Sequence, residues 1–209
     1  MFYIVKTPNW VKRFFSASIW EIKEAQKSIY LTFDDGPHPV ITPFVLNELK
    51  KYNARATFFC IGRNVVDNPL IFDRILSEEH AVGNHTQDHL NGWKTPNSEY
   101  LQNITEASIH IDSDLFRPPY GRIKAKQYKQ LRKRDRPFKI VMWSVLSGDF
   151  DVRITAEQCC ENVLKNAESG SVIVFHDSEK AYERLKYTLP VVLKYFSEKG
   201  YQFKKIVSE

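Results

Sequence analysis

The sequence predicts an α/β fold built on a parallel sheet or barrel and folded as one domain. Apolar runs of strand length alternate with amphipathic stretches along the chain, a pattern typical of repeated βα units. The 209 residues, of which 43% are hydrophobic, can bury one substantial core. The sequence has no internal repeat and no low-complexity segment, so we do not expect a second domain.

The strand candidates are apolar runs bounded by turn-forming residues. They are residues 28–33, 56–61, 81–84, 115–118, 138–145, 171–175 and 201–206. Between them, Thr155 and Gln158 fit a capping box, Pro69 suits a first helical turn, and Gly200 suits a helix stop. The alternation of strands and helices favours parallel strand pairing.

Two adjacent carboxylates, Asp34 and Asp35, follow the first strand candidate and precede Gly36. Neighbouring like charges cost free energy unless a cation, an arginine or a shared proton relieves them. Such a pair most often lies in a solvated turn. At the end of an apolar strand it indicates a metal site or a proton-transfer site.

His85 and His89 are four residues apart, so their imidazoles share one face if the segment is helical or tightly turned. Together with Asp35 they would form a set of two histidines and one carboxylate, which leaves positions open for water and substrate. Each piece alone is a weak signal, and only their combination predicts a divalent metal site. Zinc is the expected ion by ligand type, with cobalt, nickel and manganese as alternatives.

Three later segments complete a pattern: residues 117–121 (RPPYG), 143–150 (WSVLSGDF) and 172–177 (VIVFHD). With residues 30–37 and 84–89, they resemble, in order, the five motifs of the polysaccharide deacetylases. This is the NodB-homology domain of carbohydrate esterase family 4, whose members remove acetyl groups from N-acetylated sugars. The resemblance runs from about residue 28 to the end of the chain. It implies an irregular (β/α)7-type barrel and a chitooligosaccharide or peptidoglycan type of substrate.

The resemblance also implies a role for each residue in amide hydrolysis. Asp34 is the general base, and Arg117 orients it through a charge-assisted contact. The backbone N–H of Tyr120 binds the tetrahedral oxyanion. His176 protonates the leaving amine, while Asp149 stabilises the protonated imidazole and raises the pKa of His176.

Four residues are assigned to substrate binding: Pro119, Phe150, Val174 and Trp93. The resemblance implies that Val174 lines the pocket for the acetyl methyl group, where the family usually has leucine. Trp93 either stacks on a sugar ring or fills a core gap. The fourth motif departs from the family pattern, with Leu146 in place of an aspartate and Phe150 in place of a tryptophan. Phe150 keeps an aromatic wall but lacks the indole N–H donor, so the choice of substrate is the least determined feature.

The formal net charge is +5, and the excess is local, because residues 122–139 contain nine Lys or Arg and one Asp. A basic helix over residues 124–136 either binds an anionic polymer or a membrane surface, or is a solvated helix face. The solvated face is the more common case. Because no nucleic-acid-binding motif accompanies the charge, we expect an acetylated carbohydrate as the partner and no nucleic acid.

Residues 28–209 are the expected catalytic domain, and residues 1–27 are an N-terminal extension expected to pack on the barrel. Its packing candidates are Phe14, Phe15, Ile19 and Trp20. Alternatively, the extension lies on a membrane surface. Its first apolar run is too short for a signal peptide or a membrane span, and three cysteines imply no disulfide framework. We therefore expect a cytoplasmic protein without a transmembrane segment, with peripheral membrane binding or export as alternatives and the oligomeric state unassigned.

Other functions compete with N-deacetylation. The same scaffold suits an O-acetyl esterase or a small-amide hydrolase, and fold analogy does not separate these activities. A non-catalytic carbohydrate-binding protein is a second class, but pure binding would not require both a base and an acid. A third class is a polyanion binder that uses residues 122–139, which steep salt dependence would reveal.

Overall fold

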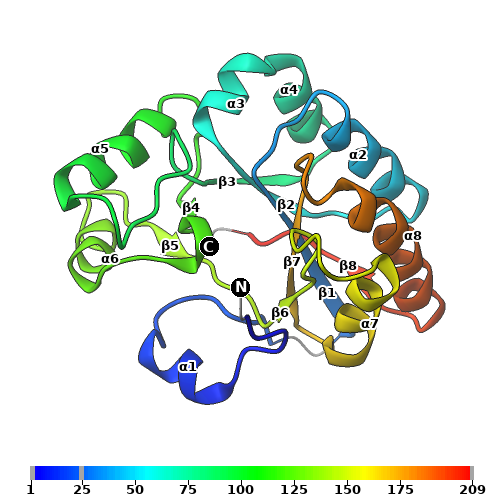
Figure 1. Ribbon diagram of the computed structural model, residues 1–209. Helices are drawn as coiled ribbons and strands as arrows, with labels where there is room; N and C mark the ends of the chain where they lie inside the picture. The colour runs from blue at the N-terminus through cyan, green and yellow to red at the C-terminus, as the bar shows by residue number, and fades with distance from the viewer. Residues whose placement is uncertain (1–2, 24–25, 208–209) are drawn as a thin grey trace.

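Parallel strands curve into a half-barrel in the computed structural model, which describes residues 3–23 and 26–207 (Figure 1). The strands are β1 (Ser28–Asp34), β2 (Thr57–Cys60), β3 (Ala81–Asn84), β4 (Leu115–Phe116), β5 (Lys139–Ile140), β6 (Val145–Leu146), β7 (Val172–His176) and β8 (Gln202–Phe203). Their spatial order is β5-β4-β3-β2-β1-β7-β6, and β8 pairs with β1 off this path. The named strands pair in parallel, which confirms the predicted irregular (β/α)7-type barrel.

The connections between the strands carry most of the helices, which lie around the outside of the strands in Figure 1. The helices are α1 (Asn9–Phe14), α2 (Ile41–Lys51), α3 (Gly62–Asp67), α4 (Pro69–Ser77), α5 (Asn97–Ala107), α6 (Ala125–Leu131), α7 (Ala156–Asn166) and α8 (Tyr182–Glu198), with a short 3-10 turn, η1, over Pro119–Gly121. Among the described residues, no helix has the length and apolar character that a membrane crossing requires.

Strand β1 forms the centre of the core, and all seven of its residues are buried. A parallel strand covered on both faces is expected to be almost continuously apolar. Phe33 of β1 stacks on Phe58 of β2 and on Phe175 of β7, with ring centroids 5.1 and 6.0 Å apart. Side chains of α2 and α8, such as Val45 and Leu189, complete this cluster, so the middle of the sheet is a rigid base for the loops beyond it.

The strand predicted over residues 138–145 is wrong, because the chain forms two separate short strands there, β5 and β6. Between them, the carbonyls of Val141 and Met142 accept hydrogen bonds from the Arg117 side chain. The N–H of Met142 donates to the carbonyl of Ile19. These long-range contacts occupy the backbone N–H and carbonyl groups that a continuous strand would use to pair with neighbouring strands. The other strand predictions agree with the structure to within three residues at each end.

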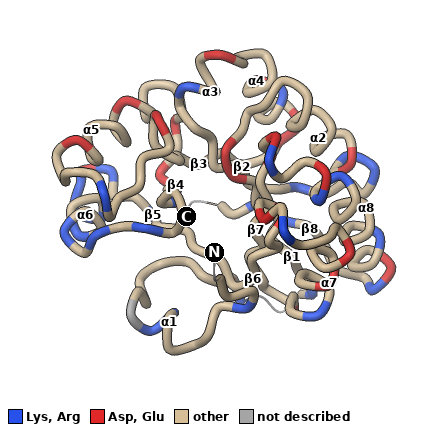
Figure 2. Tube along the Cα trace, viewed as in Figure 1, with Lys and Arg blue, Asp and Glu red and all other residues tan. Residues whose placement is uncertain are grey.

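The predicted helix ends agree with the structure. The Thr155 hydroxyl accepts from the Gln158 N–H at 3.2 Å, and the Gln158 side chain accepts from the Thr155 N–H at 2.9 Å. Helix α4 begins at Pro69, and Gly200, with a φ of 75°, follows α8. The basic helix is shorter than predicted, because α6 ends at Leu131. Figure 2 shows Lys and Arg gathered over α6.

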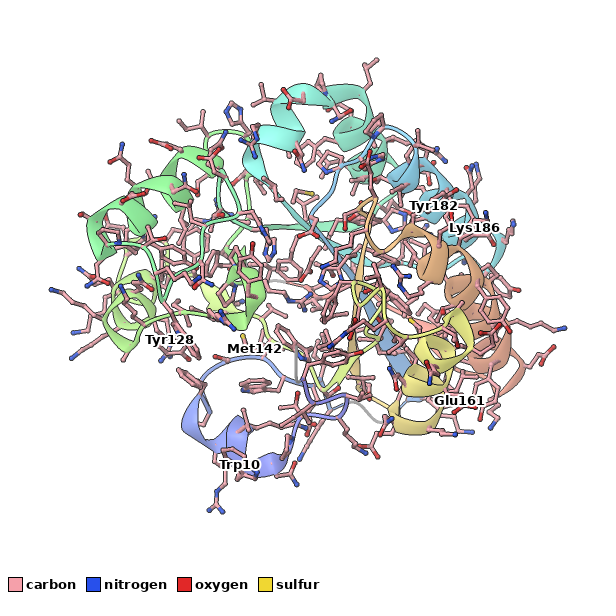
Figure 3. All side chains as sticks on the ribbon, in the orientation of Figure 1. Trp10, Tyr128, Met142, Glu161, Tyr182 and Lys186 are labelled. Atoms are coloured by element: carbon pink, nitrogen blue, oxygen red, sulfur yellow. The ribbon has the colours of Figure 1, made fainter. Side chains whose placement is uncertain are left out.

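The N-terminal segment crosses the side of the barrel on which β5 and β6 lie. Lys6 forms an antiparallel bridge with Val145, and Ile19 forms a parallel bridge with Val141. In Figure 3, Met142 lies near the middle of the molecule and Trp10 of α1 at its outer edge.

The residues expected to pack this segment on the barrel differ in their surroundings. Trp20 is buried, Ile19 is half-buried, and Phe15 is 36% exposed. The Phe15 ring nevertheless packs edge-on against Tyr128, with centroids 5.6 Å apart. The Phe14 side chain lies outside the described residues.

His80 should make the stability of the fold depend on pH. It is buried, its Nδ1 accepts from the Ala56 N–H at 3.2 Å, and burial lowers the pKa of His80 to about 4. The unfolded chain binds this proton near pH 6.5, so the stabilisation is complete above that pH and is lost as the pH falls towards 4. We expect His80 to account for a loss of roughly 3 kcal/mol between pH 7 and 4.

The measurement is urea unfolding of the wild type and of His80→Asn at both pH values. The asparagine Oδ1 occupies the position of the His80 Nδ1, so it can still accept from the Ala56 N–H but does not titrate. The wild type should lose more stability than the variant on acidification. Equal losses in the two proteins would exclude His80 as the source.

Candidate active site

The predicted catalytic residues lie at the carboxyl ends of the strands, as in other βα barrels. Asp34 ends β1 and His176 ends β7, and these two residues are register partners in the paired strands. His85 follows β3, Arg117 follows β4 and Asp149 lies just beyond β6. The parallel register therefore brings residues from distant parts of the sequence to one mouth of the barrel.

Asp35, His85 and His89 converge as predicted, and their ligand atoms all lie within 4.8 Å of one another. Asp35 Oδ1 is 3.3 Å from His89 Nε2 and 3.8 Å from His85 Nε2. This oxygen is buried and has no hydrogen-bond partner among the residues that the structure describes. A buried carboxylate oxygen without a partner is costly, and a divalent cation would satisfy it. The donor set therefore fits a metal ion.

The loops that carry these ligands are tight turns rather than helix. Asp35, Thr86 and His89 have φ values of 84°, 66° and 56°, in the left-handed region that non-glycine residues rarely adopt. The Asn84 side chain accepts from the Thr86 N–H at 2.8 Å, and the Asn64 side chain donates to the Asp35 carbonyl at 2.7 Å. These side-chain contacts hold the strained backbone in place.

His85 is oriented by the backbone of Arg117. Its Nδ1 lies 2.7 Å from the Arg117 carbonyl, which can only accept, so Nδ1 carries the proton and donates. Nε2 is then left with a lone pair directed towards Asp35. Burial, together with the neighbouring His89, holds the pKa of His85 well below its usual value. A neutral imidazole with a free Nε2 is the form that ligates metals.

Arg117 is fully buried and holds Asp34. Its Nη1 donates to Asp34 Oδ1 at 2.6 Å and to the Thr32 hydroxyl at 2.7 Å. The contact with the carboxylate therefore uses one Arg117 nitrogen and one Asp34 oxygen. As the structure describes these two residues, they form a single hydrogen bond rather than the bidentate pair that arginine often forms with a carboxylate. The guanidinium also lies 4.1 Å from the centre of the Phe59 ring. The Arg117 charge thus compensates the charge of the Asp34 carboxylate, and the hydrogen bond fixes the orientation of that carboxylate.

His176 and Asp149 form a second charged pair. His176 Nδ1 is 2.7 Å from Asp149 Oδ1, and the His176 backbone N–H donates to Asp149 Oδ2 at 2.7 Å. Burial alone would lower the pKa of His176. The charge and hydrogen bond of Asp149, with the charges of Asp35 and Asp34, raise that pKa to about 10 instead. The imidazole is therefore held in its protonated form.

Tyr120 lies beside the metal-ligand candidates. Its backbone is left-handed, with a φ of 60°, within the turn that Pro119 begins. Its ring is 55% exposed and lies 4.6 Å from the His89 ring. The structure thus places the Tyr120 ring next to the site, while the contact of the Tyr120 backbone N–H with an oxyanion stays a prediction.

The four substrate-binding candidates have different surroundings. Val174 is buried in β7 two residues before His176, so both side chains lie on the same face of that strand. Phe150 packs edge-on against the His176 ring at 5.3 Å, and Pro119 is buried in the turn beside Tyr120. Trp93 is 60% exposed, so it does not fill a core gap.

Asp177 contributes to the site in a way that the sequence reasoning missed. Its buried carboxyl accepts from the Gly36 N–H at 3.0 Å and from the Thr42 hydroxyl. Burial raises the pKa of Asp177 to about 7. A Cβ at Gly36 would lie 2.1 Å from Asp177 Oδ2, so the residue after Asp35 must be glycine. In the sequence, the signal for Asp177 was that it directly follows His176. This adjacency gave no indication that its carboxyl would contact Gly36.

Comparison with known proteins identifies the family. The family model described as polysaccharide deacetylase matches residues 21–136. The chain is 33% identical over 190 residues to a peptidoglycan-N-acetylglucosamine deacetylase of Bacillus cereus, covering 88% of each protein. It is 38% identical to a chitooligosaccharide deacetylase of Azorhizobium caulinodans, covering 75% of this chain and 76% of the relative. The chain therefore belongs to the polysaccharide deacetylase family.

A solved structure agrees with this assignment. The crystal structure of the Bc1960 peptidoglycan N-acetylglucosamine deacetylase, in complex with 4-naphthalen-1-yl-N-oxidanyl-benzamide, superposes with a TM-score of 0.85 at 33% identity. The match covers 96% of this chain and 95% of that chain. The similarity therefore extends over nearly the whole length of both chains.

Arg117→Lys should destabilise the protein strongly. Lysine keeps the charge but lacks the planar fork that reaches Asp34, Thr32 and two backbone carbonyls at once. Breaking a buried ion pair leaves an uncompensated charge, so we expect a loss of roughly 3 kcal/mol in the free energy of unfolding. Urea unfolding at pH 7 measures it, with Arg122→Lys as the control on a half-buried arginine. A loss no larger than that of the control would contradict the role given to Arg117.

Proposed function

We propose that this chain is a metal-dependent hydrolase that removes N-acetyl groups from N-acetylglucosamine units of a polysaccharide or oligosaccharide, releasing acetate. The observation that carries the proposal is the pairing of two proton-handling residues beside the metal-ligand set. Asp34, ion-paired with Arg117, and His176, protonated through Asp149, are register partners in adjacent strands. Amide hydrolysis needs a base and an acid together.

The first step is attack of water on the acetamide carbonyl. When bound, a divalent ion polarises that carbonyl and increases the acidity of the water. Asp34 takes the proton from the attacking water, and its contact with Arg117 keeps the carboxylate directed at the site. The backbone N–H of Tyr120 donates to the oxyanion as the tetrahedral intermediate forms.

The second step is departure of the amine. An amine leaves poorly as an anion, so His176 transfers its Nε2 proton to the nitrogen while the C–N bond breaks. Its Nδ1–H remains bonded to Asp149 throughout. Asp34 and His176 therefore move protons in opposite directions, and acetate and the free amine are the products.

We propose zinc as the ion, held by Asp35, His85 and His89. Two imidazoles and one carboxylate are ligands that zinc accepts readily. Cobalt, nickel and manganese are the alternatives that the same donors accept. The substrate class follows from the relatives, which are named for peptidoglycan and for chitooligosaccharide.

Asp34→Asn and His176→Ala should each lower kcat/KM for acetate release from N-acetylglucosamine oligomers by at least about 100-fold. Each change removes one proton transfer and leaves the metal ligands intact. Acetate is measured with zinc-loaded protein. The matched controls are Asp73→Asn and His110→Ala, which change exposed residues of the same types. Full activity of either site variant would exclude the role proposed for that residue.

Measurements of zinc affinity should distinguish the role of Asp35 from that of its neighbour Asp34. Asp35→Asn should lower zinc affinity by more than about 100-fold, because it removes the charged ligand. Asp34→Asn should still bind zinc, because Asp34 contacts Arg117 rather than the histidines. Zinc content after dialysis against a graded chelator measures both. Equal zinc content in Asp35→Asn and wild type would overturn the proposed ligand set.

A further inference from the structure

The N-terminal segment reaches the mouth of the barrel. Lys6 is the antiparallel bridge partner of Val145 in β6, and the Leu146 N–H donates to the Val5 carbonyl at 2.9 Å. In antiparallel pairing, moving backwards along the N-terminal segment means moving forwards along β6. This register carries Tyr3 to the carboxyl end of β6, where the loop that contains Asp149 begins.

Tyr3 is fixed there by three contacts. Its ring packs on Phe150, with centroids 5.2 Å apart and the planes tilted by 58°. A Cβ at Gly148 would lie 2.7 Å from the Tyr3 hydroxyl oxygen, so the glycine makes room for this side chain. The hydroxyl also lies close enough to Asp151 for burial, together with the Asp151 carboxylate, to raise the pKa of Tyr3.

Phe150 connects Tyr3 to the proposed catalytic acid. The Phe150 ring meets the His176 ring edge to face at 5.3 Å and 74°. Asp149 restrains only the Nδ1 edge of this imidazole, so Phe150 supplies a second restraint on the ring. Both departures from the family's fourth motif touch the N-terminal segment, Leu146 through its backbone and Phe150 through its ring.

We propose that Tyr3 is a positioning residue for His176, acting through the Phe150 ring. Without the Tyr3 ring, Phe150 can turn away, and the imidazole can leave the orientation in which Nε2 faces the leaving nitrogen. This inference rests on the proposed function, in which His176 protonates the amine. It gives the N-terminal segment a part in catalysis.

The test compares two substrates that differ in their need for an acid. An N-acetylglucosamine oligomer releases an amine that must be protonated, whereas 4-nitrophenyl acetate releases a phenolate that leaves without a proton. Tyr3→Ala should lower kcat on the oligomer roughly tenfold, part of the contribution of a general acid, with KM changed less than about twofold. Its rate on the aryl ester should stay within about twofold of wild type. Tyr3→Phe should restore the oligomer rate, because it keeps the ring.

Ile4→Ala is the matched control, because Ile4 lies in the same segment and is 47% exposed. It should leave both rates unchanged. If Tyr3→Ala lowered the rates on both substrates equally, Tyr3 would have a general structural role and the inference would be overturned. A wild-type rate of Tyr3→Ala on the oligomer would also overturn it. Absence of acetate release by the wild type, with aryl ester cleavage retained, would instead overturn the proposed function and this inference with it.

Discussion

The buried contact between Arg117 and Asp34 organises most of the site. The Arg117 side chain holds the proposed base, and its carbonyl accepts from the imidazole of His85. Its N–H donates to the carbonyl of Asn84, at the end of β3. One residue therefore connects the proposed base, a candidate metal ligand and the strand that carries that candidate. A change at this position would disturb all three together.

The same guanidinium also shapes the barrel. By binding the carbonyls of Val141 and Met142, it interrupts what would otherwise be a strand between β4 and β7. The N-terminal segment then supplies the backbone partners that are missing on this side, through Ile19 and Val5. The irregularity of the barrel and the orientation of the proposed base thus have a common origin in a single buried cation.

Much of the site was predictable from the sequence because its residues lie directly after strands. Asp34, His85, Arg117 and His176 each follow an apolar run, and parallel strands bring such positions together. The break in residues 138–145 was not predictable in this way, since it depends on the distant Arg117 side chain. Tyr3 was missed for a similar reason, because its position depends on the register of a long-range pairing that local pattern does not encode.

The left-handed backbone of Asp35, Thr86, His89 and Tyr120 has an evolutionary consequence. Glycine would adopt these conformations more readily, at a gain in the order of 1 kcal/mol at each position. At Asp35 and His89, however, it would delete a proposed ligand, so selection for stability and selection for turnover oppose each other there. Thr86 is no ligand candidate, but its buried hydroxyl accepts from the Leu90 N–H at 3.2 Å, so glycine would lose that hydrogen bond and leave a cavity. Descendants of this chain could therefore relieve the strain at the two proposed ligands only by giving up the metal site.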